Sequence, residues 1–191
     1  MSKLKCRPLI EDEFTAYDDL VQRQGTVFAQ RKWLAMHDAN MTLLGLFDGG
    51  NRLIGTFPIH TTRKFGLPVL MRSPFTPYNG PYFSKDIESS KRFFETRRFF
   101  LSEIASHIGQ QRLSLCCLSM DPACTDCMPF RWRGYKVIPG FTYRIKLTKP
   151  KKEIQANFSY ARQRNIRSAL RDSLRIESLE SYSLVERKKK K

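Results

Sequence analysis

The chain has 191 residues, of which 41% are hydrophobic and 12% aromatic, enough for a folded core and too many for an intrinsically disordered protein. Its formal net charge is +16, from 34 Lys and Arg against 18 Asp and Glu. No segment approaches the ~20 apolar residues that a membrane-spanning helix needs, and the N-terminus lacks the apolar core of a secretion signal. We therefore expect a cytoplasmic protein.

The N-terminal part of the sequence predicts a strand, two short helices and a β-hairpin. Asp48-Gly49-Gly50-Asn51 is a turn sequence between two segments rich in strand-forming residues, and it is the clearest local signal in the chain. Gly25 is a typical residue at the end of a helix. In chain order we expect a strand at Leu4–Leu9, helices at Phe14–Arg23 and Gln30–His37, and hairpin strands at Met41–Phe47 and Arg52–His60.

A loop of unusual composition follows, at Ser73–Phe83. It contains three prolines, several aromatic residues and the dipeptide Asn79-Gly80, so it cannot form a regular element. Long ordered loops in compact domains are often functional. The alternative is a crossover held by its prolines, whose aromatic residues only cap the core.

The second half continues the alternation of helices and strands. We expect a long helix at Ile87–Gly109, a strand at Leu113–Met120, a helical turn at Pro129–Gly134, a strand at Tyr135–Leu147 interrupted by Pro139-Gly140, a helix from about Glu153 and a short strand at Arg175–Leu179. This order predicts a mixed α/β fold around one sheet.

The five cysteines, Cys6, Cys116, Cys117, Cys124 and Cys127, form no regular disulfide framework, which is typical of a reducing compartment. Cys124 and Cys127 have the spacing of metal ligands, but a zinc site would need two further ligands. Cys116 and Cys117 are better explained as small apolar residues of a strand, where neighbours point to opposite faces. We therefore predict no metal site.

The positive charge is concentrated in the last third of the chain. From Arg131 to Lys191 there are 18 Lys and Arg against 5 Asp and Glu, and the basic run Arg187–Lys191 ends the sequence. Such asymmetry is typical of proteins with a polyanionic partner, such as RNA, a phosphorylated lipid carrier or a nucleotide-linked substrate. A solvated basic face is the alternative, and we prefer it for the final lysine run.

Phe158–Glu177 predicts an amphipathic helix with a strongly basic face. The apolar side consists of Phe158, Ala161, Ile166, Ala169, Leu170 and Leu174, and the basic side of Arg164, Arg167, Arg171 and Arg175. Arg162 falls within the apolar side, where an unpaired guanidinium would be costly to bury. It is either a structural or snorkelling side chain, or an arginine held in place to bind an anionic substrate.

Five segments follow one another in an order that resembles the Fem-like (FemAB-type) group of the GNAT N-acyltransferase superfamily. They are Gly25–Trp33, Leu43–Ile59, Ser73–Pro81, Phe130–Leu147 and Tyr160–Glu177. The most characteristic piece is Arg164-Asn165-Ile166-Arg167-Ser168-Ala169. The resemblance covers most of the chain and implies a GNAT-like mixed sheet flanked by helices, with the start of a second GNAT-like unit.

The resemblance divides the chain into three parts. Residues 1–140 would be a first GNAT-like domain, 141–186 an incomplete second unit of strand, helix and strand, and 187–191 a basic disordered tail. Proteins of this group usually run to about twice the length of one unit, each unit being a domain of ordinary size. We therefore expect a missing second half or a partner chain, since an incomplete sheet would leave an uncovered strand edge and helix face.

The activity implied by the resemblance is transfer of an acyl or aminoacyl group to an amine of a cell-wall or polysaccharide precursor. The donor would be acyl-CoA or aminoacyl-tRNA, and the acceptor a nucleotide- or lipid-linked precursor. These substrates imply tRNA as a possible partner and peripheral contact with a membrane. Arg162 and Arg167 would bind substrate phosphate or carboxylate. Tyr78 and Asn79 would line the acceptor pocket, and Trp33 would form its wall unless it is a core tryptophan.

Two features depart from the GNAT pattern. The sequence lacks the glycine-bearing Arg/Gln-x-x-Gly-x-Gly/Ala loop that holds the CoA diphosphate, and the basic run Gln163–Arg167 contains no glycine. His37, His60 and His107 lie near no carboxylate-bearing motif, so no catalytic base is assigned. The alternatives are a non-catalytic truncated relative that acts as a binding module and a basic nucleic-acid-binding domain, whose affinity would fall steeply with salt.

Overall fold

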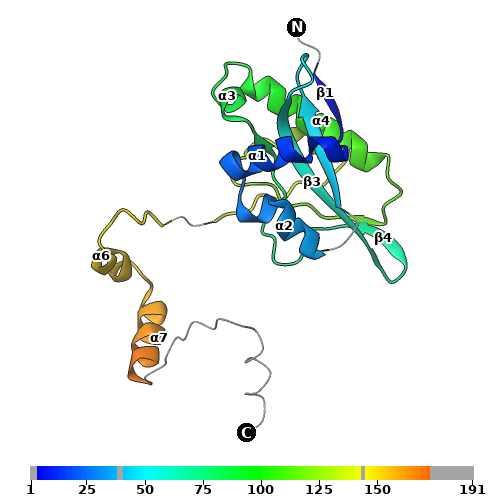
Figure 1. The fold of residues 1–191 in the computed structure, drawn as a ribbon. Helices are drawn as coiled ribbons and strands as arrows, with labels where there is room; N and C mark the ends of the chain where they lie inside the picture. The colour runs from blue at the N-terminus through cyan, green and yellow to red at the C-terminus, as the bar shows by residue number, and fades with distance from the viewer. Residues whose placement is uncertain (1–3, 38–40, 143–144, 173–191) are drawn as a thin grey trace. The chain divides into compact units, whose positions relative to one another are not determined.

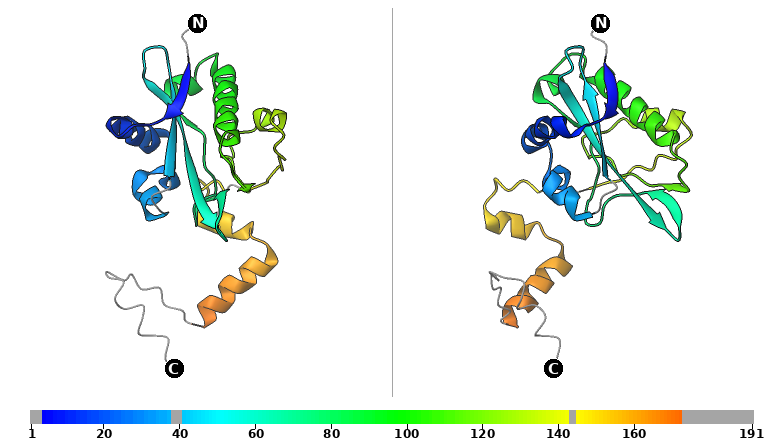
Figure 2. Two further views of the ribbon diagram at one scale, coloured as in Figure 1. Left: turned by 90° about the vertical axis from the view of Figure 1, so that its right-hand side faces the viewer. Right: turned by 45° about the vertical axis from the view of Figure 1, so that its right-hand side comes forward.

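The computed structural model describes residues 4–37, 41–142 and 145–172. The chain forms two compact units, Met1–Gly140 and Phe141–Lys191. The first unit holds a six-stranded sheet with helices on both faces (Figures 1 and 2). The described residues of the second unit hold two helices, α6 (Lys151–Ala156) and α7 (Tyr160–Arg171). The predicted mixed sheet flanked by helices is confirmed, whereas the second GNAT-like unit stays a prediction.

The sheet is antiparallel along most of its width and parallel at one edge. Its strands are β1 (Lys5–Pro8), β2 (Met41–Phe47), β3 (Leu53–Lys64), β4 (Leu67–Leu70) and β6 (Leu115–Cys116), in that spatial order, with β5 (Tyr82–Phe83) paired to β3. β4 and β6 are parallel, with Val69 opposite Leu115. Two helices lie between these strands in the sequence, as a parallel crossover requires: α3 (Lys85–Glu88) and α4 (Phe93–Gly109).

β3 is the central strand of the sheet, because one of its edges pairs with two different strands. The edge opposite β2 pairs with β5 at Gly55 and Thr56 and with β4 from Thr61 to Lys64. Pro58 lies between these two ladders. A proline cannot donate a ladder hydrogen bond, so it is tolerated where the neighbouring strand is interrupted. The gap beside Pro58 is the place where the loop between β4 and β5 meets the sheet.

Two apolar cores lie on opposite faces of the sheet, one under α4 and one under α1 (Phe14–Gln24) and α2 (Arg31–Leu34), as the side view in Figure 2 shows. The α4 core contains Leu44, Leu46, Phe57, Ile59, Phe100, Leu101, Ile104 and Ile108. The α1 core contains Tyr17, Leu20, Val21, Leu34, Leu43 and Tyr82. Leu43 and Leu44 are adjacent in β2 and enter different cores, which follows from the two-residue period of a strand.

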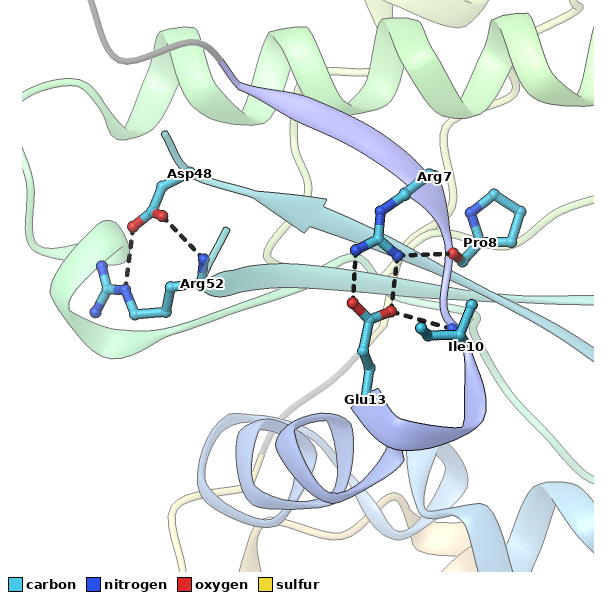
Figure 3. A network of polar contacts seen from close by, with 6 residues as sticks. All are labelled: Arg7, Pro8, Ile10, Glu13, Asp48 and Arg52. Atoms are coloured by element: carbon cyan, nitrogen blue, oxygen red, sulfur yellow. Dashed lines mark hydrogen bonds and ion pairs between the residues drawn. The ribbon is translucent and has the colours of Figure 1, made fainter. Parts of the chain in front are cut away.

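An ion pair ties β1 to the start of α1 (Figure 3). Both guanidinium Nη atoms of Arg7 donate to the Glu13 carboxylate, at 2.5 and 2.7 Å, and the Ile10 amide donates to the same carboxylate at 3.0 Å. Glu13 ends a short 3-10 helix, η1 (Glu11–Glu13), which leads directly into α1. The Arg7 guanidinium also lies 4.0 Å from the centre of the Phe47 ring.

The prediction of one continuous helix at Ile87–Gly109 is wrong for the residues before Phe93. The structure has α3 and α4 instead, separated by Ser89–Arg92. Serine side chains compete for backbone hydrogen bonds and lower helix propensity. Ile87 and Phe93 both pack against the α4 core, and the break between the helices lets each reach it.

Two predicted strands are also corrected. Of the strand expected at Leu113–Met120, only Leu115–Cys116 forms, as β6. Its partner β4 is itself only four residues long, which limits the pairing. The strand expected at Tyr135–Leu147 does not form in the described residues of that range, 135–142 and 145–147. Its apolar residues have strand propensity but no strand beside them, and propensity alone does not form a sheet. Before it, α5 (Met128–Trp132) matches the predicted helical turn.

In the second unit, the helix expected from Phe158 to Glu177 is α7, which is shorter than predicted: it begins at Tyr160 and ends at Arg171, with Asp172 at its C-cap. Residues 173–177 and the strand expected at Arg175–Leu179 lie outside the described residues. Neither α6 nor α7 contains a buried residue. None of the described helices is long and apolar enough to cross a membrane.

Candidate functional site

The two parallel strands diverge at their carboxyl ends, and this point defines the candidate site. After Leu70 of β4 the chain enters the loop 71–81, and after Cys116 of β6 it continues along 117–121. The last ladder contacts before the divergence are Cys117 N–H to Leu70 O, at 2.9 Å, and Met71 N–H to His60 O, at 3.2 Å. Ligands of open α/β sheets commonly bind where neighbouring parallel strands diverge in this way.

Asn79 joins the two diverging segments and fills the gap in the sheet. Its backbone N–H donates to Ser119 O at 2.8 Å, and its side-chain oxygen accepts from Ser119 N–H at 3.4 Å. Its side-chain nitrogen donates to Pro58 O at 3.5 Å. Asn79 is 4% exposed, so these bonds form in a site largely closed to water. The side chain therefore takes the place of a strand between β3 and the segment that follows β6.

Three aromatic side chains meet beside the loop. Phe28 belongs to the 3-10 helix η2 (Val27–Ala29), and its ring contacts Trp33 edge-on, with the ring centres 5.2 Å apart. Tyr78 contacts Phe28 in the same manner at 6.4 Å. The Trp33 indole N–H donates to Thr76 Oγ1 at 3.0 Å, which fixes the loop to α2. The cluster thus brings the N-terminal helices and the loop together.

A cavity of about 580 Å³ lies at this point. It is lined by Phe28, Met71, Arg72, Ser73, Pro74, Phe75, Thr76, Pro77 and Cys117. The volume is within the range of small-molecule sites, which are mostly apolar with a few polar groups. Phe28 and Cys117 enter it from outside the loop, and the remaining lining residues come from the loop itself.

Arg72 is the charged side chain among the lining residues, which include no carboxylate. Its guanidinium is exposed and donates to Pro77 O at 2.9 Å, a contact that holds it over the loop. A fixed guanidinium beside apolar walls suits a ligand that combines an anionic group with an apolar body. The prolines of the loop, Pro74, Pro77 and Pro81, have no N–H to offer an anion.

Phe75 is held in an unfavourable backbone conformation at the cavity. Its φ is 56°, in the left-handed region that bulky residues rarely adopt, and 88% of its surface is exposed. Such a conformation costs on the order of 1–3 kcal/mol and concentrates at functional sites.

The structure brings together three of the five residues predicted to bind substrate, Trp33, Tyr78 and Asn79. Trp33 and Tyr78 contact Phe28, which lines the cavity, and Asn79 holds the base of the loop. Trp33 is half-buried and also packs against the α1 core, so the alternative of a core tryptophan stays open. Their roles toward a substrate stay predictions.

Arg162 and Arg167 belong to the other unit, on α7, and both side chains are exposed. Ser159 caps the start of the helix, and its hydroxyl accepts the Arg162 backbone N–H at 3.4 Å. Arg162 is therefore not a buried charge in the described structure. The expectation that it and Arg167 bind an anionic substrate also stays a prediction.

Sequence patterns alone missed Phe28, Arg72, Phe75, Thr76 and Cys117 as cavity residues. One signal could have found Arg72: it begins the loop, directly before Ser73, and no acidic residue follows until Asp86. Phe28 could not have been found in this way, because it reaches the cavity from a helix that precedes the loop by more than forty residues. The described residues contain no group of three or more side chains suited to hold a metal ion.

No family model matches the sequence, and no curated protein matches it. Among solved structures, the chain is similar to a ribosomal-protein-alanine N-acetyltransferase from Brucella melitensis biovar Abortus, at 13% identity and a TM-score of 0.47, with 76% of this chain and 100% of that chain covered. It is similar to an aminoglycoside antibiotic 6'-N-acetyltransferase from Acinetobacter baumannii, at 12% identity and a TM-score of 0.39, with 75% and 98% covered. A third is a probable N-acyltransferase from Enterococcus faecalis, at 13% identity and a TM-score of 0.43, with 70% and 32% covered.

Proposed function

We propose that the chain is an N-acyltransferase whose activated acyl donor and amine acceptor meet in the cavity at the carboxyl ends of β4 and β6. The observation that carries the proposal is the position of this cavity, at the carboxyl ends of two parallel strands, where the loop after β4 lines it together with Phe28 and Cys117. The Fem-like resemblance of the sequence points to the same chemistry.

The reaction would be attack of a neutral amine on a thioester or ester carbonyl, followed by loss of the thiolate or alkoxide. It needs hydrogen-bond donors for the developing oxyanion and removal of a proton from the amine. The lining residues include no histidine and no carboxylate. The amine would therefore enter neutral or release its proton to water, and the rate would rise with pH until the free amine is fully deprotonated.

Arg72 would bind an anionic group of the donor, such as the phosphate of acyl-CoA or of an aminoacyl-tRNA. The glycine-bearing loop typical of GNAT enzymes is missing, and a proline-rich loop stands after β4 instead. A side-chain cation would then do what backbone N–H groups do in those enzymes. The acceptor would be an amine of a cell-wall or polysaccharide precursor, in keeping with the resemblance.

The test is release of free thiol from a panel of acyl-CoA donors with simple and sugar-linked amines, using the full chain. Arg72→Gln should raise the KM for the donor. Arg63→Gln is the matched control, because Arg63 is also exposed and also donates to a backbone oxygen, that of Gly66, at 3.2 Å. Absence of thiol release by the folded wild-type chain with every donor would count against the proposal, as would equal KM values for the two variants.

A second candidate function is binding of RNA by α7. The exposed side chains Arg164, Arg167 and Arg171 fall on one side of the helix together with the exposed ring of Tyr160. Arginines can contact phosphates while an aromatic ring stacks on a base. Affinity for a single-stranded RNA should then fall by orders of magnitude between low and moderate salt, and Tyr160→Ala should weaken it further. An affinity that does not change with salt would contradict this candidate.

A further inference from the structure

Cys124 and Cys127 form a pair of thiols that the proposed acyl transfer does not use. Both are free, half-buried cysteines in the turns that lead from the segment after β6 into α5. The sulfur of Cys127 lies 3.8 Å from Cys124 O, and the sulfur of Cys124 lies 3.8 Å from Asp126 O. Both sulfurs thus approach backbone carbonyls of the same four-residue turn, Cys124–Cys127, and the two thiols lie close enough to shift each other's pKa.

Hydrogen bonds within the turns around Cys124 and Cys127 fix the backbone that carries the two thiols. Cys124 N–H donates to Asp121 O at 2.8 Å, and Met128 N–H donates to the Asp126 carboxylate at 3.0 Å. Phe130, two residues into α5, is 5% exposed and anchors the far side of the turn in the α4 core. Cys124 packs against the same core.

The two thiols differ in acidity. The hydrogen bond from Cys124 lowers the pKa of the Cys127 thiol to about 7, and the Arg97 guanidinium of α4 lowers it further, while burial and the Asp126 carboxylate oppose the shift. The same hydrogen bond and burial raise the pKa of Cys124. Cys127 is therefore the thiol of the pair that loses its proton first as pH rises through neutrality, while Cys124 keeps its own.

The remaining cysteines offer no such pair. Burial raises the pKa of Cys6 to about 12, and burial also raises the pKa of Cys116. Cys117 is exposed and lines the cavity. A thiolate is the reactive form of cysteine, and attack is most efficient when the pKa lies near the ambient pH. Cys127 alone among the five combines that acidity with a second thiol in contact.

We propose that Cys124 and Cys127 are a thiol–disulfide exchange site that takes small-molecule disulfides of the glutathione class. The Cys127 thiolate attacks one sulfur of the disulfide, forms a mixed disulfide and releases one thiolate, which takes up a proton from water. Cys124 then loses its proton to water and attacks the Cys127 sulfur, which expels the second thiolate. The two cysteines are oxidised to a disulfide, and one small disulfide is reduced to two thiols.

The test is equilibration of the reduced full chain in buffers with a rising ratio of oxidised to reduced glutathione. The samples are quenched with acid, alkylated and analysed by intact mass and peptide mapping. A Cys117→Ser background removes the exposed thiol that would also react. We expect this protein to lose two hydrogens, with the new disulfide mapped to residues 124 and 127, and to regain them when the ratio is reversed.

Single substitutions in the same background separate the roles of the two thiols. Cys124→Ser should retain one glutathione on residue 127, because the second attack cannot occur. Cys127→Ser should react at least about tenfold more slowly at neutral pH, since its remaining thiol is the less acidic one. Glutathione bound to both cysteines without an internal disulfide would overturn the proposal. So would equal reaction rates of the two variants, or no disulfide at any ratio.

Discussion

The helices of the two units differ in how much apolar surface they bury. In Met1–Gly140, α1 and α4 bury apolar side chains against two faces of a sheet. In Phe141–Lys191, α6 and α7 bury none, and Leu170 of α7 is 75% exposed. The comparison separates two sources of helix formation. The described residues give α7 only local determinants, its Ser159 cap and its periodicity, whereas α4 is also stabilised by the surface that it covers.

The same contrast applies to polar side chains. Asn79 in the first unit bonds across the sheet to residues that lie more than twenty positions away. In the second unit, by contrast, Asn157 donates to Glu153 O, one helical turn away, at 3.0 Å. Long-range bonds depend on the fold, and short-range bonds depend only on the helix. Substitutions in the two units should therefore have unequal effects on the free energy of unfolding.

The largest difference should come from the cores. Phe100→Ala in α4 removes a fully buried ring whose centre lies 5.8 Å from that of Phe83, and it should lower the free energy of unfolding by about 3–5 kcal/mol. Leu170→Ala in α7 should change it by no more than about 0.5 kcal/mol. Chemical denaturation of the full chain measures both. A large effect of Leu170→Ala would mean that α7 is covered in solution, and the contrast between the units would fail.

Activity should show which unit holds the substrate anion. If the cavity binds it, Arg72→Gln should lower kcat/KM for the acyl donor about tenfold or more, because a hydrogen bond to a charged group contributes about 1.5–3 kcal/mol. If α7 binds it instead, Arg162→Ala should lower kcat/KM with the fold retained, and Arg164→Ala, on the opposite side of the helix, serves as control. Full turnover by Arg162→Ala would remove that residue from the predicted site.

Loss of Asn79 should affect both stability and the cavity. Asn79→Ala leaves Pro58 O and Ser119 N–H without their side-chain partner in a buried site, and we expect a loss of about 1–3 kcal/mol. Asn157→Ala in the second unit removes an exposed local bond and should cost much less. Denaturant midpoints of the two variants test this difference. If they shift equally, Asn79 does not bridge the strands as described.

The smallest effects should come from surface ion pairs, in either unit. Glu13→Gln breaks the pair with Arg7, and Glu153→Gln breaks the pair with Lys149. Each should cost about 1 kcal/mol, since solvent reaches both pairs and partly screens them. Thermal unfolding at low and high salt measures both, and a loss well above this value in either variant would show that the pair is more than a surface contact.

The Glu13 pair also has a predictable pH dependence. Its hydrogen bonds with Arg7 hold the pKa of the Glu13 carboxyl below its ordinary value. The folded-state pKa is the lower one, so the stabilisation is present above the ordinary carboxyl pKa and is lost as pH falls through the folded value. The difference in stability between wild type and Glu13→Gln should therefore shrink in acid. A difference that stays constant down to low pH would contradict this sign.

The success of the sequence predictions follows the range of the interactions involved. The hairpin at 48–51 forms as predicted: Asp48 accepts from Gly50 N–H and Arg52 N–H, each at 3.0 Å, within the turn itself. The end of α1 at Gly25 also depends on residues within one helical turn. The strand predicted at 135–147 does not form in the described residues of that range, because a strand requires a partner that no local pattern supplies.

The amino-acid sequence by itself determined the two short N-terminal helices, the hairpin, the basic face of α7 and the mixed α/β class of the fold. All of these depend on periodicity, turn residues and caps, which act over a few positions. The tertiary structure decided that Phe28, Arg72 and Cys117 line one cavity and that Asn79 bridges β3 to the segment after β6. Those residues are twenty to ninety positions apart, and only the order of the strands in the sheet brings them together.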